Sequence, residues 1–277
     1  MHEISLMTID DLGFAAEQTA REGWASGTDD FAVYLEHEPG GCFVAREGGR
    51  PIGMVTTTRH GVSGWIANLI VVPEARSRGV GRALMERGLA YLGAAGVATV
   101  RLDGDPPGIP LYRSLGFVDE WESLRFRWEG REAPPSSDVP EITSADLDRV
   151  LAFDAQRFGD DRGRWLRLFL ASGCRGFVIE RHGELAGYAV AVRTDPAVRI
   201  GPCVAVDAGA ARALVAAALE AGEIATVGLP EANHQARALY EDLGFRQTAS
   251  SLRMVRGPVT ASGDPNQVFA IANGAVG

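Results

Sequence analysis

The sequence predicts an α/β (α+β) protein built from two tandem halves of similar fold. Its 277 residues exceed the usual size of a single domain, so two domains are the natural expectation. The chain also repeats itself: FVAREGGRPIG begins at Phe43 and FVIERHGELAG at Phe177, while LYRSLGF at Leu111 is matched by LYEDLGF at Leu239. Because two matches in the same order are hard to produce by chance, we expect the two halves to fold alike.

Within each half, apolar strand-like runs and runs of helix formers follow one another, as in folds that pack helices on a sheet. The first half contains a hairpin that turns at Gly48–Gly49, a pair that adopts positive φ without steric cost. Gly116 follows a short helical motif, in the position where a glycine often ends a helix. The expected elements are strands over 44–46, 52–59, 65–72, 98–102 and 122–128, and helices over about 80–95 and 109–116.

A segment rich in proline, serine and charge, EGREAPPSSDVPE from Glu129, is typical of a linker, and we place the domain boundary near Pro135. Farther on, FAIANGAV near the C-terminus has strand character and is expected to seal a sheet edge. The predicted organisation is a first domain over 1–130, a linker over 131–138, a second domain over 139–257, and a tail over 258–277 that packs on the second domain.

The composition is that of a globular protein, with 46% hydrophobic residues and a formal net charge of −9. Acidity disfavours nucleic acid, because phosphates would be repelled, and it suits a cationic partner. The sequence has no membrane-spanning run and no secretory pattern at its start, so we expect a cytoplasmic protein without membrane contact.

The spacing of Cys42, Cys174 and Cys203 fits neither a disulfide framework nor a metal site, so all three are expected to be buried small hydrophobes. The chain has no lysine, which excludes Schiff-base chemistry.

One loop carries the clearest chemical signal. In VVPEARSRGVGRAL, residues 71–84, a β-branched run leads through a loop into helix formers. Gly79 and Gly81 remove side chains that would hold a ligand away from the backbone. The first N–H groups of the helix supply donors and partial positive charge, while Arg78 and Arg82 add full charges. The loop is therefore predicted to bind phosphate.

Together with LYRSLGF, this loop resembles the signature of the GNAT superfamily of N-acetyltransferases, R/Q-x-x-G-x-G/A after a strand. The resemblance covers the first half, and in the second half it covers the hairpin and NHQARALYEDLGF, so the chain is similar to two-copy bacterial acetyltransferases. It implies two tandem GNAT-type domains, each a mixed, mostly antiparallel twisted sheet flanked by helices, with acetyl-CoA as co-substrate. The resemblance places the CoA diphosphate on Arg76, Ser77, Arg78, Gly79, Val80, Gly81, Arg82 and Ala83, and the pantetheine arm along Leu69, Ile70 and Val71.

An amine that attacks a thioester needs a base for its proton, a donor for the oxyanion and an acid for the thiolate. The resemblance assigns the oxyanion donor to the backbone N–H of Val71. It assigns the acid to Tyr112, for which a purely structural role in the core is the alternative. Tyr240 occupies the matching position in the second half.

The base is less well defined by the sequence. Trp65 stands where several family members carry a glutamate, so that role is vacant or has moved. We take Asp103, just past the predicted strand ATVRL, as the candidate. Asp105 and His60 are further candidates for the base. We prefer to interpret Asp105, in a position where the family pattern has asparagine, as a helix cap or turn residue, and His60 as an ordinary surface residue at a strand end.

The second half has lost the phosphate loop. VPEARSRGVGRAL in the first half corresponds to VDAGAARAL in the second, which is four residues shorter and lacks the alternation of arginine and glycine. We predict that this half keeps the acetyltransferase shape without binding CoA. Its remaining roles would be to cover the first site, to form part of the acceptor pocket, or to make a homodimer.

The leading hypothesis is an N-acetyltransferase that moves an acetyl group from acetyl-CoA to the primary amine of a small, cationic acceptor by direct attack in a ternary complex. Trp24 and Trp65 are candidates for framing the acceptor pocket, since a cation can rest on an indole face, and a role in the core is the more common alternative for both. One alternative is a noncatalytic acyl-CoA-binding sensor or regulatory protein. Another is a protein acetyltransferase.

Overall fold

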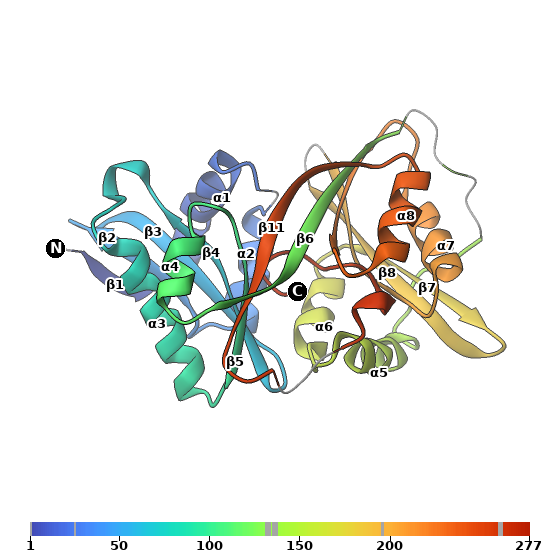
Figure 1. Cartoon of the computed structure of the whole chain (residues 1–277), viewed down its shortest axis with the longest axis horizontal. Coiled ribbons are helices and arrows are strands. Elements are labelled where there is room, and N and C mark those ends of the chain that lie inside the picture. Colours follow the sequence, from blue (N-terminus) through green and yellow to red (C-terminus); the bar gives the residue numbers. More distant parts are fainter. Residues whose placement is uncertain (1, 25, 131–133, 135–137, 195–196, 260–262) are drawn as a thin grey trace.

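A single twisted β-sheet with helices on both faces runs through the molecule (Figure 1). A computed structural model describes residues 2–24, 26–130, 134, 138–194, 197–259 and 263–277. The first half contributes strands β1 (Glu3–Leu6), β2 (Cys42–Glu47), β3 (Arg50–Arg59), β4 (Ser63–Val71), β5 (Thr99–Gly104) and β6 (Val118–Glu129), and helices α1 (Leu12–Arg21), α2 (Thr28–His37), α3 (Val80–Ala94) and α4 (Ile109–Ser114). The second half contributes strands β7 (Arg175–Arg181), β8 (Glu184–Thr194), β9 (Ala197–Ala205), β10 (Ile224–Pro230), β11 (Arg246–Arg256) and β12 (Val268–Ala270), and helices α5 (Leu147–Phe158), α6 (Gly163–Ala171), α7 (Ala208–Ala218) and α8 (His234–Asp242).

The sheet is mixed and mostly antiparallel, as the resemblance implied. Within the described residues the strand order is β1-β2-β3-β4-β5-β11-β6-β10-β9-β8-β7, and β12 pairs with β9. Among the described strand pairs, only β4–β5 and β9–β10 run parallel. The predicted hairpin, helices and strands of the first half are all present close to their expected bounds.

The two halves exchange their closing strands. In Figure 1, β11 and β6 run next to each other through the centre of the molecule, and they pair antiparallel. β11 of the second half pairs with β5 of the first, and β6 of the first half pairs with β10 of the second. Each half therefore completes the sheet of the other. The duplication in the sequence does not by itself predict this exchange. Most of the predicted linker, including Pro135, lies outside the described residues.

At two places in the sheet, two parallel strands begin as paired neighbours and then separate. β4 and β5 pair only from Ser63 to Trp65 on the β4 side. Beyond that point β4 is bulged, with Asn68 at a φ of 51°, and the two strands separate. β9 and β10 separate in the same way after Ile200, next to a register shift in the pairing of β8 with β9.

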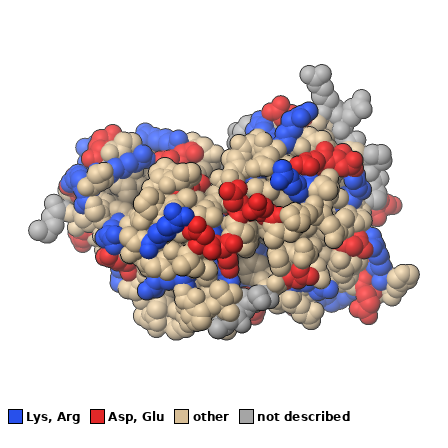
Figure 2. All heavy atoms as spheres, in the orientation of Figure 1, with Lys and Arg blue, Asp and Glu red and all other residues tan. Residues whose placement is uncertain are grey.

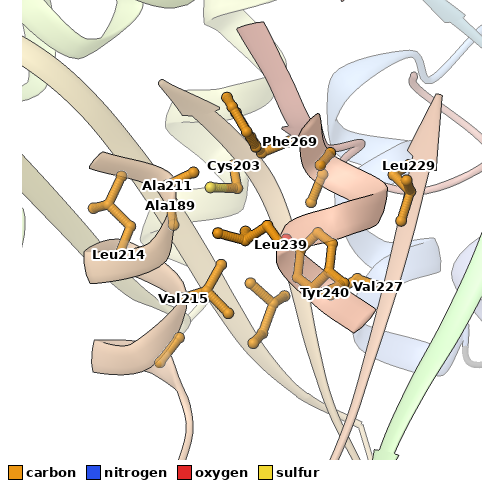
Figure 3. Close-up of a cluster of buried hydrophobic side chains, with 14 of the residues drawn as sticks. Ala189, Cys203, Ala211, Leu214, Val215, Val227, Leu229, Leu239, Tyr240 and Phe269 are labelled. Atoms are coloured by element: carbon orange, nitrogen blue, oxygen red, sulfur yellow. The ribbon is translucent and has the colours of Figure 1, made fainter. Parts of the chain in front are cut away.

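The core has three parts. One lies under α3 and α4, and a second under α7 and α8 (Figure 3). The third is on the opposite face, where side chains of α2, α5 and α6 and the C-terminal residues pack together, so both halves share it. Cys42 and Cys203 are buried as expected, but Cys174 is only half-buried, and its thiol donates to the Phe169 carbonyl (2.7 Å). No helix among the described residues is long and apolar enough to cross a bilayer.

Candidate active site

A cleft of about 440 Å³ opens where β4 and β5 separate. Both strands, the loop before α3, the residues after α1 and the start of α4 form its wall. Its lining includes most of the predicted CoA contacts, together with side chains that can hold or move protons. The lining residues that the following paragraphs use are Glu22, Trp24, Leu69, Ile70, Val71, Arg76, Ser77, Gly79, Gly81, Arg82, Asp103, Asp105 and Tyr112.

The loop between β4 and α3 presents free backbone donors at the edge of the cleft. Gly79 is the N-cap of α3 and has a φ of 82°, which glycine adopts without the steric cost of a side chain. Among the described residues, no side chain caps this helix. The N–H groups of Val80, Gly81 and Arg82 therefore lack intrahelical partners, and with the helix dipole they form an anion-binding end.

Arginines surround this helix start in exposed ion pairs. Arg76 Nη2 donates to Glu22 (2.7 Å), and Arg78 pairs with Glu47. The side chains of Arg76, Arg78 and Arg82 are 53%, 45% and 46% exposed. Because exposed pairs contribute only about 0–1 kcal/mol, a phosphate can replace these carboxylates at small cost.

Three of the predicted CoA contacts do not line the cleft. Arg78 points to Glu47, Val80 is 1% exposed with its side chain in the core under α3, and the Ala83 N–H donates to the Gly79 carbonyl (3.0 Å). Val80 can thus offer only its backbone N–H, and Ala83 offers no free donor.

The backbone of Val71 faces the space between the separating strands. The Val72 N–H donates to the Ile52 carbonyl on β3 (3.0 Å). Since successive N–H groups of a strand point to opposite sides, the Val71 N–H points away from β3 and toward β5. The Val71 carbonyl lies on the same side and accepts from Arg76 Nε (2.8 Å). Val71 is therefore oriented as an oxyanion donor requires.

Tyr112 projects from α4 into the wall of the cleft. Its side chain is 9% exposed, and its ring packs edge-on against Phe117 with centroids 6.3 Å apart. Burial, and to a lesser extent the nearby Asp105 charge, raises the pKa of Tyr112 to about 12. The phenol therefore stays protonated at neutral pH and is able to donate a hydrogen bond.

Asp103 reaches the cleft but is held by two arginines. Arg253 of β11 binds both carboxylate oxygens, and Arg125 of β6 donates to Oδ2 (3.1 Å). Burial alone would raise the pKa of Asp103, but these two guanidinium groups together lower it below its ordinary value. A saturated, weakly basic carboxylate is poorly suited to take a proton from an amine, which speaks against the predicted role of Asp103 as base.

Asp105 has the opposite environment. Burial raises its pKa above the ordinary value, while a hydrogen bond from Trp24 partly offsets this effect. Asp105 does not cap a helix, because the N-cap of α4 is Gly108 and no side chain caps that helix within the described residues. It does begin a turn, the other role we expected, since its backbone carbonyl accepts from the Gly108 N–H (2.9 Å). Asp105, Trp24 and Tyr112 thus line one end of the cleft together.

Two other predicted residues lie elsewhere. Trp65 is 1% exposed and stacks against the guanidinium of Arg253 (4.4 Å), outside the lining of the cleft, so it does not frame an acceptor pocket there. His60 is 9% exposed rather than on the surface, and its Nε2 lies 3.1 Å from the Val276 carbonyl. Burial lowers the pKa of His60 to about 4, so the ring is neutral at physiological pH.

The N-terminus of α7 in the second half corresponds to that of α3, but it is capped by a side chain of the chain itself. Asp207 is the N-cap of α7, and its carboxylate accepts from the Ala210 N–H (2.8 Å). Its other oxygen pairs with Arg181. A phosphate would therefore meet a negative charge here, where α3 offers free donors.

The sequence offers Asp105 as a candidate base, although a cap or turn role is the preferred interpretation there. A signal was present, since aspartate at this position replaces the asparagine that the second half keeps as Asn233. A change from amide to carboxylate beside the cleft introduces a group that can accept a proton.

Comparisons with known proteins agree with this architecture. Family models described as acetyltransferase (GNAT) match residues 10–117 and 150–270. A mycothiol acetyltransferase from Clavibacter michiganensis is 29% identical over 280 residues, covering 86% of this chain and 87% of that protein.

Solved structures share the fold over nearly the whole chain. A protein of known crystal structure from Pyrococcus horikoshii superposes with a TM-score of 0.87 at 26% identity, covering 100% of this chain and 96% of that one. A tandem GNAT protein from the clavulanic acid biosynthesis pathway superposes with a TM-score of 0.65 at 18% identity, covering 93% and 98% of the two chains, and so shares the fold alone. Since the two family matches together span most of the sequence, the chain belongs to the GNAT family of acetyltransferases and carries two copies of its fold in tandem.

Proposed function

We propose that the chain transfers an acetyl group from acetyl-CoA to the primary amine of a small, cationic acceptor, by direct attack in a ternary complex at the cleft of the first half. The observation that carries this proposal is the cleft itself. It joins a helix start with free donors to a buried tyrosine and a carboxylate of raised pKa. The similarity to a mycothiol acetyltransferase along most of both chains supports acetyl transfer to a small molecule.

Acetyl-CoA would lie with its diphosphate on the N–H groups of Val80, Gly81 and Arg82, beside Arg76. Its pantetheine arm would follow the backbone of Leu69 to Val71, since this side of β4 is left unpaired by β5. The thioester oxygen would then lie near the Val71 N–H, which stabilises the negative charge that develops during attack.

In the reaction, the amine nitrogen attacks the thioester carbon and a C–N bond forms. Asp105 accepts the proton that the nitrogen loses, because its raised pKa makes it the more basic of the two aspartates in the cleft. The C–S bond then breaks, and the Tyr112 hydroxyl donates a hydrogen bond to the leaving thiolate. Asp103 takes no proton and instead anchors β5 to β6 and β11.

Acidic groups favour a cationic acceptor. Glu22 and Asp105 lie in the cleft wall, and Figure 2 shows acidic side chains gathered along the middle of the visible face, where the halves meet. Figure 2 also shows arginines and carboxylates interspersed over both halves rather than one basic face. The formal net charge of −9 also favours a cationic acceptor.

The proposal is tested by thiol release from acetyl-CoA with a panel of small amines. Tyr112→Phe should lower kcat by about 10²-fold or more while the Kd for acetyl-CoA stays within a few-fold, since the lost hydrogen bond acts on the leaving group. Tyr240→Phe is the matched control, because Tyr240 is fully buried with no hydrogen-bond partner for its hydroxyl among the described residues and should leave turnover unchanged. Tight CoA binding without turnover on any amine or protein would instead indicate a sensor.

A second prediction concerns pH. Below its raised pKa, Asp105 is protonated and cannot accept the amine proton, so kcat/KM should rise with pH through that pKa, above the range of an ordinary aspartate. Asp105→Asn should lower kcat/KM by about 10²-fold or more and remove this part of the pH profile. An unchanged profile in the variant would show that another group is the base.

A further inference from the structure

In the second half, β9 and β10 also separate, and the C-terminal segment, residues 263–277, fills the gap between them, which we call the second cleft. β9 and β10 pair up to Ile200 and Val227 and then separate, as β4 and β5 do. In the gap, β12 pairs with β9, placing Val268 opposite Val204 and Ala270 opposite Cys203. The Ile271 N–H then donates to the Gly228 carbonyl on β10 (2.8 Å). The segment thus bridges both separated strands.

The part of β9 that it covers corresponds to the part of β4 that faces the first cleft. The repeat offset that joins Val72 to Val206 also joins Leu69 to Cys203, Ile70 to Val204 and Val71 to Ala205. β12 therefore pairs with the residues that match the proposed pantetheine contacts of the first half.

The segment passes from one face of the sheet to the other. Figure 3 shows Phe269 beside Cys203 and Leu239 in the cluster under α7 and α8. A few residues later, Ala272 and Val276 belong to the core on the opposite face, with α2, α5 and α6. A Cβ at Gly201 would lie 2.0 Å from the Ile271 carbonyl oxygen, so glycine at this position permits the passage.

Asn233 fastens the segment in place. Its Oδ1 caps α8 by accepting from the Ala236 N–H (2.8 Å), which leaves its Nδ2 free to donate elsewhere. Nδ2 donates to the carbonyls of Asn266 and Val268, both at 3.0 Å, and the side chain is completely buried. In the first half the corresponding residue is Asp105, whose side chain accepts a hydrogen bond from Trp24 instead.

Beyond the sheet, the segment extends to the first half. The Asn273 amide donates to the Tyr34 hydroxyl of α2 (3.1 Å). A Cβ at Gly274 would lie 3.3 Å from Arg125 Nη2 and 3.4 Å from Asp103 Oδ2, so the segment lies directly against the charge network at the first cleft. The segment predicted to pack on the second domain therefore contacts both halves.

We propose that the C-terminal segment is the resident ligand of the second cleft, in the place that an acyl-pantetheine arm would take. We propose also that it supports the wall of the first cleft at Asp103, two residues from the proposed base Asp105, and so positions the acceptor there. This rests on the proposed function for the first half. The second copy has then become a scaffold that holds the segment, and Gly274 is a positioning residue that keeps the Asp103–Arg125–Arg253 network in place.

Hydrogen exchange of the full chain, with and without acetyl-CoA, tests the first part without any need for turnover. We expect the amides of 268–271 to be strongly protected in both states, and new protection on CoA addition only around 69–83. Loss of protection at 268–271 on CoA addition would overturn the proposal, because it would show that the segment and the cofactor exchange in the second cleft.

Kinetics of Gly274→Ala and Gly274→Val test the second part. The larger side chain should raise the acceptor KM about tenfold or more, alanine should raise it less, and the Kd for acetyl-CoA should not change. Asn266→Ala is the matched control, since this side chain is exposed on the same segment and its backbone carbonyl is retained. An acceptor KM that stays at the wild-type value in both Gly274 variants would overturn the positioning role.

The outcomes separate this inference from the proposed function. If no amine is acetylated by the wild-type protein, the proposed function fails, while hydrogen exchange still decides whether the segment is a resident ligand. If turnover is normal and exchange shows displacement by CoA, the proposed function holds and the inference fails.

Discussion

Asp103 and Asp105 are two positions apart, and their surroundings give them opposite properties. The sequence predicts that both residues follow a strand at the cleft, because the strand pattern ATVRL stands directly before them. It cannot show that Arg253, 150 positions away, neutralises Asp103, since that contact depends on the strand exchange. Environments that move the pKa values of neighbouring carboxyl groups apart are typical of catalytic pairs, and here they favour Asp105 as the base.

Asp103→Asn should destabilise the protein by about 3 kcal/mol, because breaking a buried ion pair leaves uncompensated charge, here on Arg253 and Arg125. The free energy of unfolding in urea measures this. Asp119→Asn is the control, since the Asp119–Arg113 pair is exposed and should contribute less than about 1 kcal/mol. A loss of similar size in both variants would contradict the account.

The same pair sets a pH dependence of stability. Because the pKa of Asp103 is lowered in the folded state, its stabilising contribution is complete above its unfolded pKa and is lost as pH falls through the folded value. The difference in unfolding free energy between wild type and Asp103→Asn should therefore shrink in acid. A constant difference from neutral to acidic pH would exclude this origin.

The helices α3 and α7 show how one element can gain or lose a function at its first turn. α3 starts at Gly79 with free N–H groups, whereas α7 starts at Asp207, whose carboxylate uses one donor. The four-residue deletion made this loss predictable from the sequence, because the glycine-rich turn is a local feature. The position of the C-terminal segment in the second cleft was not predictable. A strand at the edge of a sheet and a strand inserted between two others can have the same hydrophobic pattern.

Asp207→Ala should lower stability by about 1 kcal/mol through loss of the helix cap. It should not create acetyl-CoA binding, because the loop remains short and the second cleft remains filled. Thermal unfolding with and without acetyl-CoA measures both effects. A CoA-dependent increase in Tm larger than that of wild type would contradict this view of the second half.

For the molecule as a whole, the exchange of β6 and β11 makes one sheet out of two copies. The sequence predicts both closing strands and the duplication. It cannot tell which half each strand joins, because β6 and β11 follow the same motif in the two copies and would fit either sheet. The domain bounds 1–130 and 139–257 thus remain a prediction about sequence units, while the sheet and one of the cores are shared.

Fragments 1–130 and 138–277 produced separately should fail to unfold cooperatively, because each exposes the edge that the other half's closing strand covers. Mixed or co-expressed, they should associate and regain the circular dichroism spectrum of the full chain. Cooperative unfolding of either fragment alone would show that the exchange is not required for folding.

Calorimetric titration of the full chain with acetyl-CoA tests whether the first half alone binds the cofactor. Gly81→Asp places a carboxylate at the start of α3, and the fold should accept it, because a Cβ there would be 3.6 Å from Val71 Cγ2 and 3.7 Å from Leu111 Cδ2. We predict one molecule bound per chain in wild type and in Asp207→Ala, and none in Gly81→Asp. Two molecules per chain would show that the second half also binds acetyl-CoA, and binding that survives in Gly81→Asp would show that the start of α3 does not hold the cofactor.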